Sequence, residues 1–162
     1  MVLLSGRFMA RVTILAGILL AGVSSPAVAQ SSIGFAGGAS VDPEQVYVGV
    51  FWQSPDIGGR FRLRPGIDGG FGNDLRVATI NFDFIYLIPL GQGPWTFVTG
   101  GGPTVALTRL SDDRFDTGTE VSGGGSYLFG FSHDNGFFTE FRLGGGNVPN
   151  LKMGAGWAVR LR

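Results

Sequence analysis

The end of the chain, residues 151–162, alternates strictly between apolar side chains and small or charged ones. Successive side chains of a β-strand point to opposite faces, so this period of two predicts a strand with one apolar wall and one polar or small wall. An amphipathic helix would repeat its apolar positions every three to four residues instead. The apolar wall of this strand consists of Leu151, Met153, Ala155, Trp157, Val159 and Leu161.

The beginning of the chain has the three parts of an export signal. Arg7 and Arg11 are followed by an apolar run over residues 12–23, and the small-residue sequence Ala27-Val28-Ala29 comes after a proline. The run is shorter than the ~20 apolar residues that a transmembrane helix needs. We therefore expect a signal peptide over residues 1–29, cleaved between Ala29 and Gln30, and one domain over residues 30–162.

The composition of that domain excludes several classes of protein. The chain has no cysteine, so a disulfide framework and a cysteine-linked lipid anchor are both excluded. Without the two arginines of the signal, ten basic residues face 12 acidic ones, and this balance does not indicate a nucleic-acid partner. After residue 30 no segment has the period or the length of a membrane-spanning helix. If the domain lies in a membrane, it must be a closed barrel, because only then are all backbone polar groups satisfied in lipid.

Eight segments of the domain have strand character, and clusters of Gly, Pro, Asn and Asp separate them. An even number of strands with short connections predicts an all-β, antiparallel, up-and-down barrel. Pro65 and Pro103 lie inside predicted strands and predict bulges there. The predicted strands cover residues 33–41, 46–53, 59–71, 75–88, 95–108, 118–131, 137–146 and 150–161.

The two walls of these strands differ in a way that favours a membrane barrel. In residues 59–71, for example, Phe61, Leu63 and Ile67 share the wall opposite the arginines. A soluble sandwich or barrel also alternates, but its outer wall meets water and is rich in charges, whereas charged residues make up only 15% of this chain. We therefore expect the apolar wall to face lipid and the polar wall to face the lumen. A soluble periplasmic ligand-binding barrel is the alternative.

The charged side chains of the polar wall predict an ion-pair network inside the barrel. An eight-stranded barrel is just wide enough to be filled by its own side chains, and buried charges need counter-charges. Such a filled lumen predicts little or no ion conduction, with a narrow passive channel as the alternative. The predicted lumen residues are Arg60, Arg62, Arg64, Asp68, Asp83, Glu120, Glu140, Arg142, Lys152 and Arg160.

The tight turn at residues 72–74 limits how the third and fourth strands pair. One register of this hairpin sets Asp83 opposite Arg62, and a second sets it opposite Arg64. Either register predicts a buried ion pair at the middle of the barrel, with Glu140 as a further partner.

On this pattern the whole of residues 30–162 resembles the small outer-membrane β-barrels of the OmpA/OmpX kind from Gram-negative bacteria. The resemblance implies that both termini and the turns after the second, fourth and sixth strands lie in the periplasm. It also implies a non-enzymatic contribution to envelope structure, contact with outer-membrane lipid and lipopolysaccharide, insertion by the barrel-assembly machinery, and a monomer. Aromatic side chains, which favour membrane interfaces, gather near that periplasmic rim: Trp52, Phe61, Tyr86, Trp95, Phe129, Phe131, Phe137 and Trp157.

Little in the sequence indicates a catalytic or metal-binding site. His133 is the only histidine, and the stretch 133–135 lacks the serine of the His-x-Ser pair found in outer-membrane lipid A deacylases. Asp112, Asp113 and Asp116 could supply carboxylate oxygens to a divalent cation, but a solvated acidic loop is the preferred interpretation. We expect no catalytic residue, no cofactor and no metal, and a lipid-modifying membrane enzyme is the alternative.

Overall fold

The structure is a computed structural model that describes residues 30–72, 75–110 and 119–161. In these ranges the chain forms eight strands and is all-β. Among the described residues, no helix has the length and apolar character needed to cross a membrane. The strands are β1 (Ser32–Val41), β2 (Glu44–Gln53), β3 (Phe61–Gly72), β4 (Leu75–Pro89), β5 (Trp95–Leu110), β6 (Glu120–His133), β7 (Phe137–Gly146) and β8 (Leu151–Arg160).

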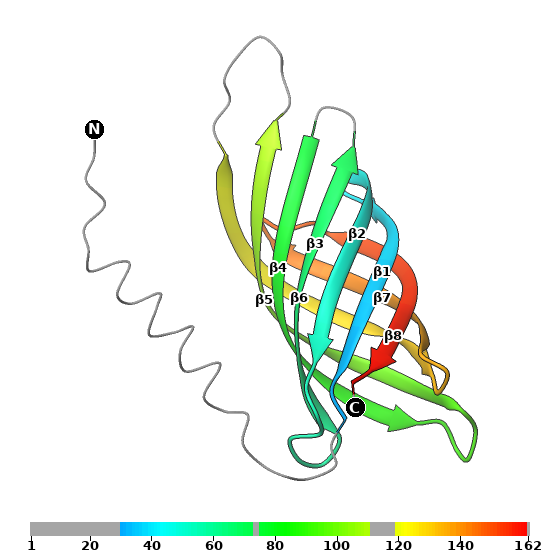
Figure 1. Ribbon diagram of the computed structural model, residues 1–162. Helices are drawn as coiled ribbons and strands as arrows, with labels where there is room; N and C mark the ends of the chain where they lie inside the picture. Colours follow the sequence, from blue (N-terminus) through cyan, green and yellow to red (C-terminus); the bar gives the residue numbers. More distant parts are fainter. Residues whose placement is uncertain (1–29, 73–74, 111–118, 162) are drawn as a thin grey trace.

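The strands form a closed antiparallel barrel in up-and-down order (Figure 1). Each strand pairs with its neighbours in sequence, and β1 pairs with β8 to complete the ring. Tracing paired residues once around the barrel from Arg109 leads back to Thr99 in the same strand, a displacement of ten residues. Such a stagger accompanies strands that tilt by roughly 35–45° from the barrel axis. The predicted eight-stranded barrel is confirmed.

The two ends of the barrel differ. At one, called here the terminal end, β1 begins and β8 ends, with Ser32 opposite Arg160. The connections from β2 to β3, β4 to β5 and β6 to β7 lie at this same end. At the other, called the far end, β3 to β6 extend well beyond the remaining strands (Figure 1). The predicted acidic loop with Asp112, Asp113 and Asp116 lies outside the described residues.

The observed strand ends lie within two residues of the predicted ones. The predicted bulges at Pro65 and Pro103 are wrong. Pro65 stands opposite Phe82 in an unbroken register. Near Pro103 the pairing of β4 with β5 is interrupted and resumes in the same register on the other side. A proline removes a backbone donor, which here interrupts the ladder locally without an extra residue being inserted.

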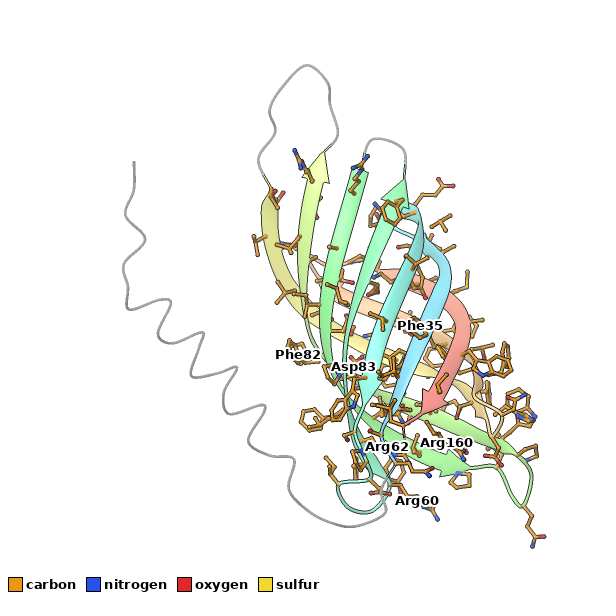
Figure 2. All side chains as sticks on the ribbon, in the orientation of Figure 1. Phe35, Arg60, Arg62, Phe82, Asp83 and Arg160 are labelled. Carbon is orange, nitrogen blue, oxygen red and sulfur yellow. The ribbon has the colours of Figure 1, made fainter. Side chains whose placement is uncertain are left out.

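The walls of the barrel are inverted relative to a soluble protein. Large apolar side chains cover the outside, and Phe35, Phe71 and Phe84 are each more than half exposed. Phe82 and Asp83 follow one another in β4, yet Phe82 is 44% exposed and Asp83 is 1% exposed (Figure 2). A contiguous apolar exterior of this extent marks a surface that water does not cover.

Four layers follow one another inside the barrel. At the terminal end is an open hollow, and beyond it lies an apolar floor that includes Ile85, Val98 and Leu128. A charged layer occupies the middle. At the far end the connection between β7 and β8 folds inward, where buried Val148 packs on inward-facing residues of β4 and β5. The backbone N–H of Asn150 donates to the carbonyl of Asp42 and holds this connection in place.

Candidate functional site: the charged lumen

The middle of the lumen is filled by side chains that the period of two directs inward. Even positions of β3, β7 and β8 and odd positions of β4 meet there, so residues distant in sequence come together. The charged members are buried or nearly so. They form three ion pairs that cross the lumen, and each pair joins strands that are not neighbours in the sheet.

The first ion pair joins Arg142 of β7 to Asp83 of β4. The two terminal nitrogens of Arg142 donate to the two carboxylate oxygens of Asp83 at 3.0 and 2.7 Å. Arg142 Nη1 also donates to Ser126 Oγ at 2.8 Å. A two-pronged arginine–carboxylate contact is the strongest and most directional of protein ion pairs, so it fixes β4 relative to β7 across the barrel.

The second pair joins Arg64 of β3 to Glu140 of β7, which lie on opposite walls. Arg64 Nη2 donates to Glu140 Oε2. The guanidinium also lies 3.6 Å from the ring centroid of Phe51 and 5.6 Å from that of Phe138. A guanidinium over an aromatic face is attracted to the negative face of the ring. Glu140 approaches Arg142 as well, at 3.9 Å, and this contact connects the first two pairs.

The third pair lies nearer the far end. Lys152 Nζ of β8 is 3.2 Å from Asp68 Oδ1 of β3 and donates to Thr79 Oγ1 at 3.0 Å. The amide of Asn81 donates to Asp68 Oδ2 at 2.9 Å, so Asp68 has several donors around its charge. Thr104 connects this pair to the first one, because its hydroxyl is 3.0 Å from Asn81 Oδ1 and 3.1 Å from Ser126 Oγ. Hydrogen bonds and ion pairs therefore connect the whole layer into one network.

The predicted partner of Asp83 is wrong, although one predicted register is observed. Asp83 does stand opposite Arg64 in the pairing of β3 with β4. Its carboxylate nevertheless bonds to Arg142 across the lumen, and Arg64 bonds to Glu140 instead. The reason is geometric. Long side chains of a narrow barrel point toward its axis, where they reach the opposite wall rather than the neighbouring strand.

The structure leaves four of the ten predicted lumen residues outside this network. Arg60 precedes β3, is exposed in a turn and has a positive φ of 74°, so it does not lie in the lumen. Glu120 begins β6 at the far end and is exposed. Arg62 and Arg160 line the hollow at the terminal end instead (Figure 2).

That hollow has a volume of about 730 Å³ and opens at the terminal end. Arg62, Arg160, Asp56 and His133 are among its lining residues. Arg160 donates weakly to the carbonyl of Asp134 at 3.5 Å, and the buried Nε of Arg62 has no hydrogen-bond partner among the described residues. The floor of Ile85, Val98 and Leu128 with the aromatic rings beside Arg64 separates the hollow from the charged layer.

The lumen also holds three aromatic side chains that the predicted network omits: Tyr47, Phe51 and Phe138, all buried. Each occupies the space beside an inward-facing glycine. A Cβ atom on Gly34 would meet the ring of Phe51, one on Gly154 the hydroxyl of Tyr47, and one on Gly156 the ring of Phe138. One pattern in the sequence could have predicted these inward rings. Large aromatic residues stand at inward positions of β2 and β7, and glycines stand at inward positions of β1 and β8.

The predicted interface aromatics lie on the outer wall, most of them toward the terminal end. Phe61 is opposite Tyr86, and Phe137 is opposite Trp157. Trp52 is opposite Ile33, near the beginning of β1. Several of the rings contact one another, with centroids 4.7 Å apart for Phe61 and Tyr86 and 6.1 Å apart for Phe137 and Trp157. Trp95, Phe97 and Phe131 on β5 and β6 belong to the same band of aromatic side chains, called here the aromatic girdle. Phe129 lies farther from the terminal end and stacks on Phe141.

His133 has a structural place at the end of β6. Its Nδ1 accepts the backbone N–H of Asn135 at 3.1 Å, and its ring meets Trp95 edge-on with centroids 4.8 Å apart. Within the part of the chain that the structure describes, no group of three histidine, aspartate or glutamate side chains could hold a metal ion.

The eight strands in closed up-and-down order have the fold of the small outer-membrane β-barrels, and two solved structures share this fold. Neither a family model nor a curated protein matches the chain. The N-terminal β-barrel domain of Pseudomonas aeruginosa OprF matches with a TM-score of 0.61 and 12% identity, over 82% of this chain and 97% of that one. Neisserial surface protein A (NspA) matches with a TM-score of 0.58 and 15% identity, over 82% and 95%. At such low identity the likeness shows the fold.

Proposed function

We propose that the chain is an integral protein of the bacterial outer membrane that contributes to envelope structure without catalysing a reaction, and that its charged layer plugs the lumen. The observation that carries the proposal is the inversion of the two walls. Phenylalanine and valine side chains are exposed on the outside while the ion pairs are buried inside. Such an arrangement is stable only when lipid covers the outside.

The ion pairs of the charged layer support the proposal that this layer plugs the lumen. Side chains of Arg64, Asp83, Glu140 and Arg142 are each 9% exposed or less and bond to one another across the lumen. Apolar layers lie on both sides of them. Their hydrogen-bonding capacity is directed inward, out of reach of the lipid outside, and this supports a structural role over a lipid-modifying one.

The membrane assignment is tested by fractionation of cells that express the full chain. We expect the protein in the outer-membrane fraction, released only by detergent. On gels it should migrate differently before and after boiling, because a closed ladder without free edge strands resists detergent. Release by a salt wash alone, or one unchanged band under both conditions, would contradict the proposal.

The same preparation tests the export signal and the orientation. Cleavage after Ala29 would leave Gln30 as the first residue of the mature protein, and mass spectrometry of the purified protein detects this directly. We further propose that the terminal end faces the periplasm, that the barrel-assembly machinery inserts the chain, and that the barrel is a monomer. A tag added after Arg162 should then remain protected from protease in intact cells. Cleavage of the tag would show that the terminal end faces the outside of the cell instead.

A further inference from the structure

In the described part of the chain, the outer wall of the barrel has one pair of like charges set directly opposite each other. Arg76 of β4 pairs with Arg109 of β5, and both side chains are exposed. Inward positions are odd in β4 and even in β5, as the buried Val77 and Ala106 show, so both arginines project outward. Side chains opposite each other in an antiparallel pair have Cβ atoms about 4.5–5.5 Å apart, and like charges at that separation repel.

The height of this pair on the wall coincides with the edge of the apolar band. Tyr86 and Thr99 are also opposite each other, and Tyr86 belongs to the aromatic girdle of the terminal end. The two pairs are ten residues apart along both strands. At ~3.3 Å per residue and a tilt near 40°, ten residues span roughly 25 Å along the barrel axis. That is the height of the apolar band of an outer-membrane barrel.

The residues beside the two arginines also indicate that the apolar band of the outer wall ends at the height of the pair. Ala78 and Leu107, the next outward positions toward the membrane centre, are apolar and opposite each other. Phe71 of β3 lies opposite Arg76 on its other side and is 58% exposed. The pair therefore sits where an apolar wall ends, at the depth of lipid headgroups.

The charges near the pair leave its positive potential uncancelled in the described part of the chain. Neither arginine forms an ion pair with a described residue. Glu120 lies on the inward parity of β6, so the wall of the barrel separates it from Arg109. Glu44, the nearest described acid of outward parity, is on β2, two strands away from Arg76.

We propose that Arg76 and Arg109 together bind a phosphate group of lipid A, the phosphorylated glycolipid that forms the outer leaflet. This inference rests on the proposed membrane function and on the periplasmic position of the terminal end. Guanidinium groups match the geometry of phosphate oxygens and bind them through paired hydrogen bonds. A phosphate between the two arginines also removes the repulsion that the register imposes on them.

The test uses the full mature chain folded in detergent micelles, with binding of purified lipid A measured by native mass spectrometry. The double variant Arg76→Gln/Arg109→Gln is compared with wild type. Arg60→Gln is the matched control, because it removes an exposed arginine at the opposite rim. We expect lipid A with both phosphates to bind the double variant roughly tenfold more weakly than wild type or the control. Lipid A from which the phosphates have been removed should bind all three proteins equally.

Two results would overturn the inference. Equal binding of phosphorylated lipid A by wild type and the double variant would show that the pair is not the site. Displacement of the lipid by millimolar inorganic phosphate would identify a small-anion site instead of a lipid site. The boiled and unboiled gel bands of each variant show that it is folded, so failure of the lipid test leaves the membrane assignment intact.

Discussion

Arg62 and Arg64 lie two residues apart in β3 and on the same inward parity, yet their surroundings differ. Arg64 is bonded to Glu140 and packed on Phe51, deep in the charged layer. Arg62 lines the hollow and forms no ion pair with any residue that the structure describes. Sequence parity therefore decides which face an arginine takes, whereas depth along the barrel decides whether protein or water must compensate its charge.

The largest expected effect is the loss of one partner from the charged layer. Asp83→Ala leaves Arg142 buried without its carboxylate, which should lower the free energy of unfolding by about 3–5 kcal/mol. Urea unfolding in detergent micelles measures this loss. Glu44→Ala removes an exposed acid from β2 and should change the value by about 0.5 kcal/mol or less. Equal losses for the two variants would mean that the charged layer does not stabilise the barrel.

The same experiment distinguishes the observed partner of Asp83 from the one that the hairpin register predicts. In double-mutant cycles, Asp83→Ala should couple to Arg142→Ala by about 0.5–3 kcal/mol, as expected for groups in direct contact. The coupling to Arg64→Ala should be smaller, because Arg64 is opposite Asp83 in the register but forms its ion pair with Glu140. A larger coupling to Arg64 would restore the predicted pair.

The next effect concerns the aromatic side chains between the hollow and the charged layer. Gly34→Ala places a methyl group against the ring of Phe51, and such overpacking costs about 1–3 kcal/mol. Gly37→Ala in the same strand meets only the carbonyl oxygen of Tyr47, at 3.7 Å, and should be close to neutral. Thermal unfolding of the two variants side by side gives the comparison. A similar fall in melting temperature for both would show that Phe51 is not held against Gly34.

The smallest effect is expected at the hollow. Arg62→Gln removes a charge that forms no ion pair with a described residue, so the free energy of unfolding should change by about 0.5 kcal/mol or less. Arg64→Gln, two residues away, should cost several times more, because Glu140 loses its main partner. Urea titrations of both variants provide the measurement, and a loss at Arg62 as large as that at Arg64 would remove the distinction between the two regions.

The fold could be predicted because the features that determine it are local. Strict alternation predicts the two walls, and the turn residues separate the segments and so give the number of strands. The closed barrel and the outward position of Phe84 or Trp157 follow from these two features. The register of β3 with β4 was narrowed to two possibilities by its turn, and one of them is observed. The bulge predicted at Pro65 failed because a missing donor need not add a residue to the strand.

The partners within the lumen could not be predicted in the same way. Asp83 bonds to Arg142 rather than to its cross-strand neighbour Arg64, because the side chains extend toward the barrel axis. The height of each side chain along that axis depends on the stagger of the whole sheet. Arg60 was misplaced for a related reason, since a shift of two residues at the beginning of β3 moves it from the lumen into a turn. Such contacts depend on the closed three-dimensional arrangement, which alternation alone does not contain.

The most direct test of the plug is a planar-bilayer recording of the folded barrel. Wild type should show no stable openings, because the charged layer and the apolar layers beside it fill the lumen. A variant that removes both members of the central pair, Asp83→Ser/Arg142→Ser, should show small, frequent openings in the same bilayers. Stable openings of large conductance in wild type would contradict the account, and the barrel would then be a channel.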